Sequence, residues 1–375
     1  MLAKRPPMGW NSWNTFGENI SEQLIFEIAD AMVEKGYRDA GYNYLVIDDC
    51  WSERSRDAQG QLVADPVKFP HGMKHVADYV HSRGLKFGMY SCAGVMTCAK
   101  YPGSFGHEFE DARAFAGWGV DFLKYDFCNF PKSAHCQTMY RRMGMALKAC
   151  GREILFSACN WGVEEPGEWM RSAGAQMYRS TGDINDSFAS IRDIAQSQID
   201  KLCYSGYGCF NDMDMLVTGM YGKGNVALTG CSDMEYLTHH ALWCLFGVPL
   251  MIGGDVRALS EESRSILLNP GLLAIDQDEE CRPPYQVNPG EDAMPIFFRH
   301  LADHTFALAF FNFDDEREHT ADCILEDIGL PYGSGLGLEL TDVVSGERIG
   351  VQRDYFSVTL PAHGCRVFRA KIAEA

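Results

Sequence analysis

The sequence predicts an α/β fold, a (β/α)₈ barrel followed by a C-terminal antiparallel β-sandwich domain. Eight short apolar runs alternate with segments of helical period over about 280 residues, which is the size and rhythm of such a barrel. Beyond about residue 282 the chain changes to short runs rich in β-branched and aromatic residues, a pattern typical of antiparallel sheets. A length of 375 residues accommodates a barrel and a small second domain.

The eight apolar runs are the predicted barrel strands. Parallel barrel strands are buried on both faces, so they read as short, nearly continuous apolar stretches. The runs span residues 7–13, 42–49, 85–92, 121–128, 153–159, 177–183, 209–215 and 249–255. A doubly wound open sheet is the alternative, but it usually has fewer strands and a glycine-rich turn after its first strand, which this sequence lacks.

The segments between the runs carry helix signals. Residues 21–37 place Leu24, Ile25 and Ile28 on one stripe, and Ser21 is the expected N-cap. Residues 71–84 end in Gly84, which suits the position just after a helix. Further helices are expected at roughly 107–118, 134–150, 187–201, 232–246 and 260–269.

The C-terminal part begins with a linker. Residues 281–292, CRPPYQVNPGED, are rich in proline and polar residues, so we assign 1–282 to the barrel and 283–375 to the β domain. Helical period is nearly absent there except near 322–328. The glycines of 333–340 are followed by no helix, so they predict a turn rather than a nucleotide-binding loop.

The composition excludes several partners. A net charge of −18 argues against nucleic acid and against anionic membrane surfaces. The N-terminus lacks the apolar core of a secretory signal, and no stretch approaches the roughly 20 apolar residues of a membrane helix. We therefore expect a soluble cytoplasmic protein whose 14 cysteines are mostly reduced, with no nucleic-acid or membrane partner; a homo-oligomer stays open.

Polar and charged residues end almost every predicted strand. In a barrel these positions face the catalytic mouth. Single aspartates can instead cap the following helix, which is our reading of Asp255 and of one of Asp48 and Asp49, and Lys124 can form a structural ion pair with Asp126. Unpaired buried charge costs several kcal/mol, so a barrel with this many charged strand ends is expected to use them in a functional site. The polar and charged residues at the strand ends are Asp48, Asp49, Tyr90, Lys124, Asp126, Asn160, Asp183, Asp212, Asp214 and Asp255.

The residue types in this ring favour sugar chemistry. The sequence has no HExxH motif and no histidine cluster at strand ends, and Lys124 and Arg179 would repel a cation, so we predict no metal and no cofactor. Aspartates accept hydrogen bonds from sugar hydroxyls, and flat side chains pack on the apolar face of a pyranose. Trp13, Trp51, Tyr90 and Trp161 are the candidate flat partners.

A series of ordered motifs resembles glycoside hydrolase family 27, which contains α-galactosidases and α-N-acetylgalactosaminidases. The resemblance covers most of the barrel, including PPMGWNSWNTFG (6–17), IDDCW (47–51), WGVDFLKYDFCN (118–129), RSTGDINDSF (179–188) and NDMDML (211–216). It implies a barrel followed by an antiparallel β-sandwich. It also implies a retaining exo-glycosidase that removes terminal α-linked galactose from oligosaccharides or glycoconjugates.

The resemblance assigns roles to single residues. Asp126 is similar to the family's nucleophile and Asp183 to its general acid/base. Lys124 would bind sugar hydroxyls and lower the pKa of Asp126. The remaining contacts to the sugar would come from Asp48 and Asp49 at the 4- and 6-hydroxyls, Arg179 and Asp214 at the 2- and 3-hydroxyls, and Trp13 and Tyr90 along the walls.

Two departures from the family pattern leave questions open. The family often has glutamate after the cysteine of strand five, in contact with the 2-hydroxyl, whereas this chain has Asn160 beside Trp161. α-N-Acetylgalactosaminidase is therefore an alternative to α-galactosidase. β-L-Arabinopyranosidase is a further alternative, since that sugar is galactose without C6, although the Asp48–Asp49 pair favours galactose. Cys98 and Cys128 match a family disulfide, while Cys50 and Cys159 match bridged positions whose partners are missing.

The sequence disfavours two other classes of barrel protein. A non-catalytic, carbohydrate-binding barrel is disfavoured because both candidate carboxylates and Lys124 are present. A barrel enzyme for phosphorylated metabolites would need a basic, glycine-rich site after strands seven and eight, where this chain is mainly acidic.

Overall fold

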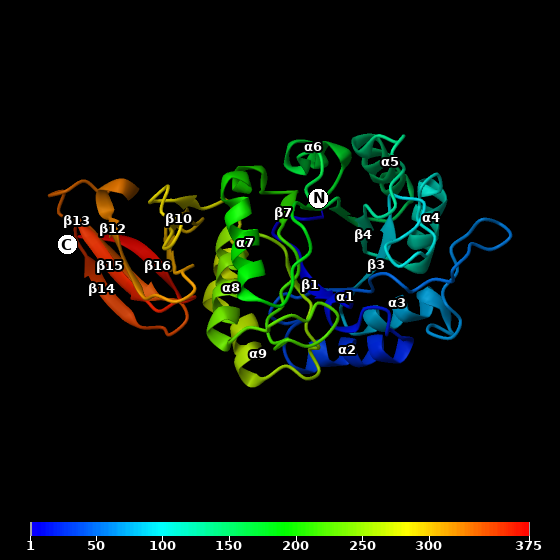
Figure 1. The fold of residues 1–375 in the computed structure, drawn as a ribbon, viewed down its shortest axis with the longest axis horizontal. Coiled ribbons are helices and arrows are strands. Elements are labelled where there is room, and N and C mark those ends of the chain that lie inside the picture. Colours follow the sequence, from blue (N-terminus) through cyan, green and yellow to red (C-terminus); the bar gives the residue numbers. More distant parts are fainter. Residues whose placement is uncertain (1, 375) are drawn as a thin grey trace.

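The computed structural model describes residues 2–374 and divides into a barrel and a β-sandwich that lie end to end (Figure 1). Each of the eight predicted runs contains a strand of the barrel sheet. The strands are β1 (Met8–Asn11), β2 (Tyr44–Val46), β3 (Lys86–Cys92), β4 (Phe122–Asp126), β5 (Leu155–Cys159), β6 (Met177–Arg179), β7 (Phe210–Asp212) and β8 (Leu250–Ile252). The predicted fold class is confirmed.

The barrel sheet is parallel and follows the chain order. Neighbouring strands run β7-β6-β5-β4-β3-β2-β1-β8. The circle closes through the segment after β7, where the Leu216 backbone N–H donates to the Met251 carbonyl (2.7 Å) and the Gly253 N–H donates to Leu216 (2.9 Å). All eight strands therefore end at one mouth, as a parallel barrel requires.

Helices connect consecutive strands and cover the barrel. They are α1 (Trp13–Phe16), α2 (Glu22–Glu34), α3 (Gly72–Ser82), α4 (Glu108–Trp118), α5 (Cys136–Ala149), α6 (Pro166–Ala173), α7 (Phe188–Gln198), α8 (Asp233–Phe246), α9 (Glu261–Leu267) and α10 (Pro270–Asp276), with a 3₁₀ helix η1 (Ile199–Tyr204). The Ser21 side chain caps α2 by accepting from the Leu24 N–H, as predicted. The sequence did not predict α6 or α10, two short helices that each begin with proline.

The C-terminal part is an antiparallel sandwich of two sheets. Its elements are β9 (Tyr285–Gln286), β10 (Ile296–His300), β11 (Phe306–Phe311), β12 (His319–Ile324), η2 (Leu325–Ile328), β13 (Leu336–Asp342), β14 (Arg348–Gln352), β15 (Tyr355–Leu360) and β16 (Cys365–Glu374). Six strands form one sheet in the order β14-β13-β16-β11-β10-β9, and β12 and β15 form the other. Side chains of both sheets, such as Phe310 and Phe356, share one apolar core.

The sandwich packs on the barrel through α7 and α8 (Figure 1). Phe297, Phe311 and Val367 of the sandwich belong to the same apolar cluster as the barrel core, so the contact between the two parts is apolar. The barrel's last helix ends at Asp276 and β9 begins at Tyr285. The domain boundary at 282/283 lies in the connecting segment and stays a prediction.

Across residues 2–374, the model contains no helix with the length and apolar character needed to span a membrane.

Candidate active site

A cavity opens at the carboxyl ends of the barrel strands. The empty space between its lining atoms, including the part open to solvent, is about 530 Å³. Except Asn160, the cavity brings together every residue to which the family resemblance assigns a role. The lining residues are Trp13, Asn14, Asp48, Asp49, Tyr90, Cys98, Lys124, Asp126, Cys159, Trp161, Arg179, Asp183, Ile184, Asp214, Met215 and Val226.

Asp126 is a buried carboxylate fixed by two donors. It is the last residue of β4 and only 7% exposed. The Tyr90 hydroxyl donates to Oδ2 (2.9 Å) and the Phe127 backbone N–H donates to Oδ1 (2.8 Å). Burial raises the pKa of Asp126 above its ordinary value, against the opposing effect of Lys124. Lys124 lowers the pKa of Asp126 as expected, but the loss of hydration on burial outweighs this effect, so the net shift is upward.

Lys124 forms its ion pair with a different aspartate. Its Nζ lies 2.8 Å from Asp48 Oδ2, which also accepts a hydrogen bond from the Asn11 side chain (2.8 Å). Burial works to lower the pKa of Lys124, but the negative charges of Asp48 and other nearby groups raise it above its ordinary value. Lys124 is therefore cationic. The two oxygens of Asp126 are held by the Tyr90 hydroxyl and the Phe127 backbone N–H and not by Lys124.

Arg179 joins two carboxylates on the opposite side of the mouth. Its Nη2 lies 2.8 Å from Asp183 Oδ1 and 2.8 Å from Asp214 Oδ2. The Asp183 side chain is 76% exposed, whereas the side chains of Arg179 and Asp214 are almost completely buried. The arrangement leaves Asp183 as the carboxylate of this group that solvent and a substrate can reach.

Asp214 has a strained backbone. Its φ is +85°, in the left-handed region that non-glycine residues rarely occupy. The conformation is held by hydrogen bonds to the Asp214 carboxylate from the backbone N–H groups of Ile184 (2.8 Å) and Met215 (2.7 Å). Strain of this kind concentrates at functional sites, where the surrounding structure enforces it.

Asp49 is fixed by the loop that follows β3. One oxygen accepts from the Cys50 N–H (2.7 Å) and the other from the Ala99 N–H (3.1 Å). Burial raises the pKa of Asp49 above its ordinary value. Asp48 and Asp49 thus both line the cavity, and their carboxylates are held by different donors.

Comparison with known proteins places this site in a family. The family model for alpha galactosidase A matches residues 5–278. The chain belongs to the alpha-galactosidase family. A second model, for the alpha galactosidase C-terminal beta sandwich domain, matches residues 291–370.

Three relatives of this alpha-galactosidase family chain illustrate the similarity. The alpha-galactosidase of Cyamopsis tetragonoloba is 39% identical over 374 residues, which are 98% of this chain and 86% of the relative. The structure of alpha-galactosidase I from Mortierella vinacea has a TM-score of 0.92 at 32% identity, covering 98% and 97% of the two chains. The structure of an alpha-galactosidase from Saccharomyces cerevisiae with raffinose has a TM-score of 0.91 at 30% identity, covering 99% and 98%.

The predicted sugar-binding residue Asn160 does not line the cavity of this alpha-galactosidase family member. Its side chain is buried and donates to the Val163 carbonyl (2.5 Å). The preceding and following residues, Cys159 and Trp161, line the cavity instead. The reason is the alternation of side chains along β5, since Leu155, Ser157 and Cys159 share one face. Counting from Leu155 along that face would have predicted Cys159 from the sequence.

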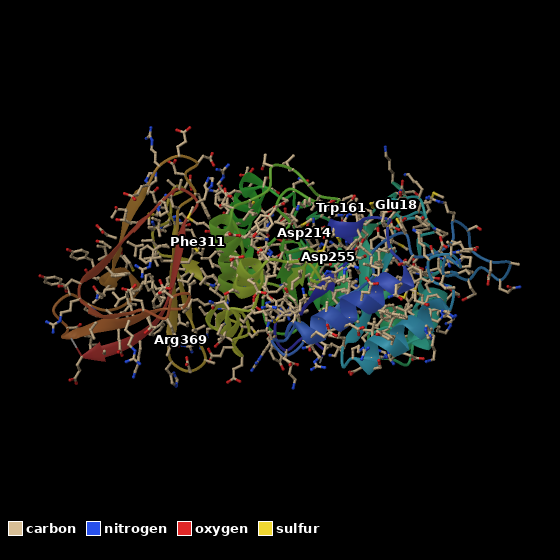
Figure 2. The ribbon with its side chains drawn as sticks, turned by 90° about the horizontal axis from the view of Figure 1, so that it is seen from below. Glu18, Trp161, Asp214, Asp255, Phe311 and Arg369 are labelled. Carbon is tan, nitrogen blue, oxygen red and sulfur yellow. A yellow bond between two sulfur atoms is a disulfide. The ribbon has the colours of Figure 1, made fainter. Side chains whose placement is uncertain are left out.

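Three other candidates lie outside this cavity. Trp51 is buried in the core, where its Nε1 donates to the Tyr90 carbonyl (2.9 Å) and its ring packs on Trp118. Asp212 lies below the mouth, where burial raises its pKa to about 6. Asp255 pairs with Arg257 (2.8 Å) beside a neighbouring cavity, and Figure 2 shows it together with Asp214 and Trp161 in the barrel half of the molecule.

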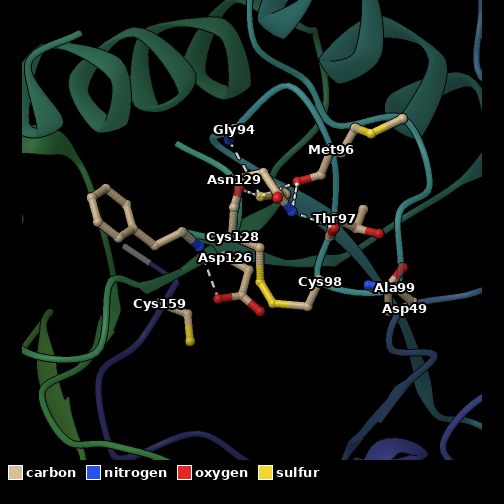
Figure 3. The surroundings of a disulfide bond; sticks show 12 residues. Asp49, Gly94, Met96, Thr97, Cys98, Ala99, Asp126, Cys128, Asn129 and Cys159 are labelled. Atoms are coloured by element: carbon tan, nitrogen blue, oxygen red, sulfur yellow. Dashed lines mark hydrogen bonds between the residues drawn. A yellow bond between two sulfur atoms is a disulfide. The ribbon is translucent and has the colours of Figure 1, made fainter. Parts of the chain in front are cut away.

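A disulfide borders the candidate nucleophile. Cys98 and Cys128 are bonded, and Figure 3 shows the bond beside the Asp126 carboxylate, whose oxygen lies within 4.8 Å of both sulfur atoms. It ties the loop after β3, which carries the Ala99 N–H, to the end of β4. The other twelve cysteines, all within residues 2–374, carry unpaired thiols, including Cys50 and Cys159.

Proposed function

We propose that this chain removes terminal α-linked galactose from oligosaccharides or glycoconjugates by double displacement with retention. The observation that carries the proposal is one cavity at the barrel mouth in which Asp126 and Asp183 both form part of the wall. Membership of the alpha-galactosidase family and the related yeast structure with raffinose support the choice of sugar.

In the first step Asp126 acts as the nucleophile. One carboxylate oxygen attacks the anomeric carbon while the bond to the leaving oxygen breaks, which gives a glycosyl ester of Asp126. Tyr90 and the Phe127 N–H hold the carboxylate in position, and the Lys124 charge favours its anionic form. Asp183 gives its proton to the leaving oxygen, so the aglycone departs as a neutral alcohol.

In the second step Asp183 acts as the base. It takes a proton from a water molecule, whose oxygen attacks the anomeric carbon and releases Asp126 as a carboxylate. The exposure of the Asp183 side chain gives this water a direct approach. The same exposure lets the Asp183 carboxyl leave Arg179 and turn toward the glycosidic oxygen. The proton transfer of the first step requires this change of partner.

Specificity would come from the fixed charges around the two acids. Asp48 and Asp49 are anchored by Asn11, Lys124 and the Ala99 N–H, so their remaining lone pairs are oriented for the 4- and 6-hydroxyls. Arg179 and Asp214 would bind the 2- and 3-hydroxyls, with Trp13 and Trp161 as walls. The Cys159 thiol, whose pKa burial raises well above its ordinary value, is a neutral group in the same cavity.

The experiment is a parallel assay with stereochemical analysis of the product. Purified protein is tested on p-nitrophenyl α-galactoside, the α-N-acetylgalactosaminide and the β-L-arabinopyranoside. We expect the highest kcat/KM on the galactoside and α-galactose as the first product in the NMR spectrum. A higher kcat/KM on either of the other substrates would overturn the specificity, and β-galactose as the first product would overturn the mechanism.

We also propose a cytoplasmic location. Twelve unpaired cysteines, with Cys203 exposed, are typical of a protein in a reducing compartment. Cell fractionation with antibodies against the native protein tests this, and recovery of the folded protein outside the cytoplasmic membrane would contradict it.

A further inference from the structure

A cluster of metal-binding side chains lies outside the active site, between α2 and α3. It consists of Glu22, the first residue of α2, with His71 and His75 at the start of α3. One potential ligand atom from each residue lies within 4.8 Å of the other two. Figure 1 shows α2 and α3 side by side on the barrel surface, so the cluster bridges two segments that are far apart in the sequence.

The carboxylate of Glu22 is only partly satisfied. The residue is 8% exposed, and its Oε1 lies 2.8 Å from His71 Nδ1. Its Oε2 is buried and has no hydrogen-bond partner among the atoms of residues 2–374. A buried carboxylate oxygen without a partner is costly, so this oxygen favours a further donor or a cation.

The two histidines supply the access and the remaining ligands. They are four positions apart, with His71 at the N-cap of α3, a spacing that brings side chains together at one face of a helix. Their rings lie 4.9 Å apart between centroids. The His71 side chain is 64% exposed and His75 is exposed, so an ion from solvent can reach both rings.

We propose that Glu22, His71 and His75 form a binding site for a divalent transition-metal ion of the Zn²⁺ type. Two imidazoles and one carboxylate match the ligand preference of Zn²⁺, which takes a solvent molecule as its fourth ligand in such sites. Ca²⁺ and Mg²⁺ prefer sites made only of oxygen ligands. Binding replaces the contact between His71 Nδ1 and Glu22 Oε1.

The ion would tie the segment after β1 to the segment after β2. Glu22 follows the β1 loop, and its backbone N–H donates to Lys68 in the loop before α3 (2.8 Å). The N-terminal ends of α2 and α3 carry partial positive charge, which opposes a cation and limits the affinity. We therefore expect micromolar binding that stabilises the fold and does not take part in the reaction.

The test is calorimetric titration of the full, tag-free, EDTA-treated chain with ZnCl₂ at pH 7.5. We expect one micromolar site whose affinity falls at least tenfold in the double variant His71→Ala/His75→Ala. Both side chains are exposed, so the variant should fold normally. His304→Ala, at an exposed histidine of the sandwich, is the matched control and should bind as the parent does. Unchanged binding in the double variant, or no binding in the parent, would overturn the proposal.

Two further readouts separate this site from the free thiols. Zn²⁺ should raise the melting temperature of the parent and of His304→Ala, but not of the double variant. Co²⁺ bound to nitrogen and oxygen ligands lacks the intense near-ultraviolet charge-transfer band of cobalt thiolates. The appearance of such a band at one equivalent, lost in Cys203→Ser and retained in the double variant, would assign the ion to cysteine and reject the site.

Discussion

At the scale of single residues, the two charges of β4 have separate partners. Lys124 binds Asp48 from the neighbouring part of the mouth, and Asp126 is bound by Tyr90 and a backbone N–H. The two side chains share one face of the strand because they are two residues apart. This division leaves the cation close enough to favour an anionic Asp126 without occupying its oxygens.

The two proposed catalytic acids should differ in how much activity their removal costs on different substrates. Asp126→Asn should lower kcat by on the order of 10⁴-fold on every substrate, because the ester cannot form. Asp183→Asn should reduce activity strongly on raffinose but much less on p-nitrophenyl α-galactoside, whose leaving group needs no proton. Kinetics on both substrates measure this difference. An equal loss on the two substrates would contradict the role of Asp183.

The pH dependence of kcat/KM should follow the ionisation of the buried Asp126 carboxylate. Asp126 must be ionised to attack, and burial raises its pKa above 3.8, so kcat/KM should fall on acidification with a midpoint above that value. Lys124→Met removes the cation that opposes burial and should move the midpoint to higher pH. Circular dichroism at each pH shows whether the chain stays folded. A midpoint unchanged or lowered in Lys124→Met would contradict this account.

The pair Asn160 and Trp161 offers a test of the register of β5. Asn160→Ala should leave KM within about twofold of the parent, since the side chain points away from the cavity, and should lower stability by about 1 kcal/mol through the lost hydrogen bond to Val163. Trp161→Ala removes a wall of the cavity and should raise KM by about tenfold. A large KM change in Asn160→Ala would place its side chain at the sugar after all.

At the scale of elements, the sequence predicted all eight strands because buried parallel strands are short apolar runs with polar ends. Helices with long apolar stripes, such as α2, were equally visible. The short helix α6 was missed because its eight residues are fewer than the roughly 11–18 residues over which helical period is recognised. Asn160 was misplaced because the side to which a residue points depends on where the strand starts, and an apolar run does not fix that start.

The disulfide offers a prediction at the same scale. The Cys98–Cys128 bond closes a loop with a sequence separation of 30 residues and holds the backbone N–H that binds Asp49. Cys98→Ser/Cys128→Ser should lower the free energy of unfolding by about 3–4 kcal/mol. It should also raise KM, because the Ala99 N–H is no longer held at Asp49. Cys203→Ser, at an exposed free thiol, is the control that should change neither quantity. Denaturant unfolding and initial rates measure both effects.

At the scale of the whole molecule, barrel and sandwich are joined through a buried arginine. Arg299 of β10 is 1% exposed, and its Nη1 donates to the carbonyls of Cys244 (3.1 Å) and Leu245 (2.9 Å) at the end of α8. The Cys244 carbonyl also accepts from the Gly247 backbone N–H just after the helix (3.2 Å), and the guanidinium gives a donor to the Leu245 carbonyl and a second donor to that of Cys244. The guanidinium also interacts favourably with the helix C-terminus. Phe297 and Phe311 extend the barrel's apolar cluster around this contact.

A shared core of this kind predicts that the two parts unfold together. Arg299→Met should lower the free energy of unfolding by about 2–3 kcal/mol, because it leaves the buried Leu245 carbonyl without its side-chain donor and removes one of two donors from the Cys244 carbonyl. Arg369→Ala, which breaks the exposed pair with Asp303 on the outer part of the sandwich (Figure 2), should change stability by less than about 1 kcal/mol. Differential scanning calorimetry should show one transition in the parent that moves as a whole to lower temperature in Arg299→Met. If instead a separate sandwich transition moves while the barrel transition stays in place, the two parts are independent and the coupling through Arg299 is disproved.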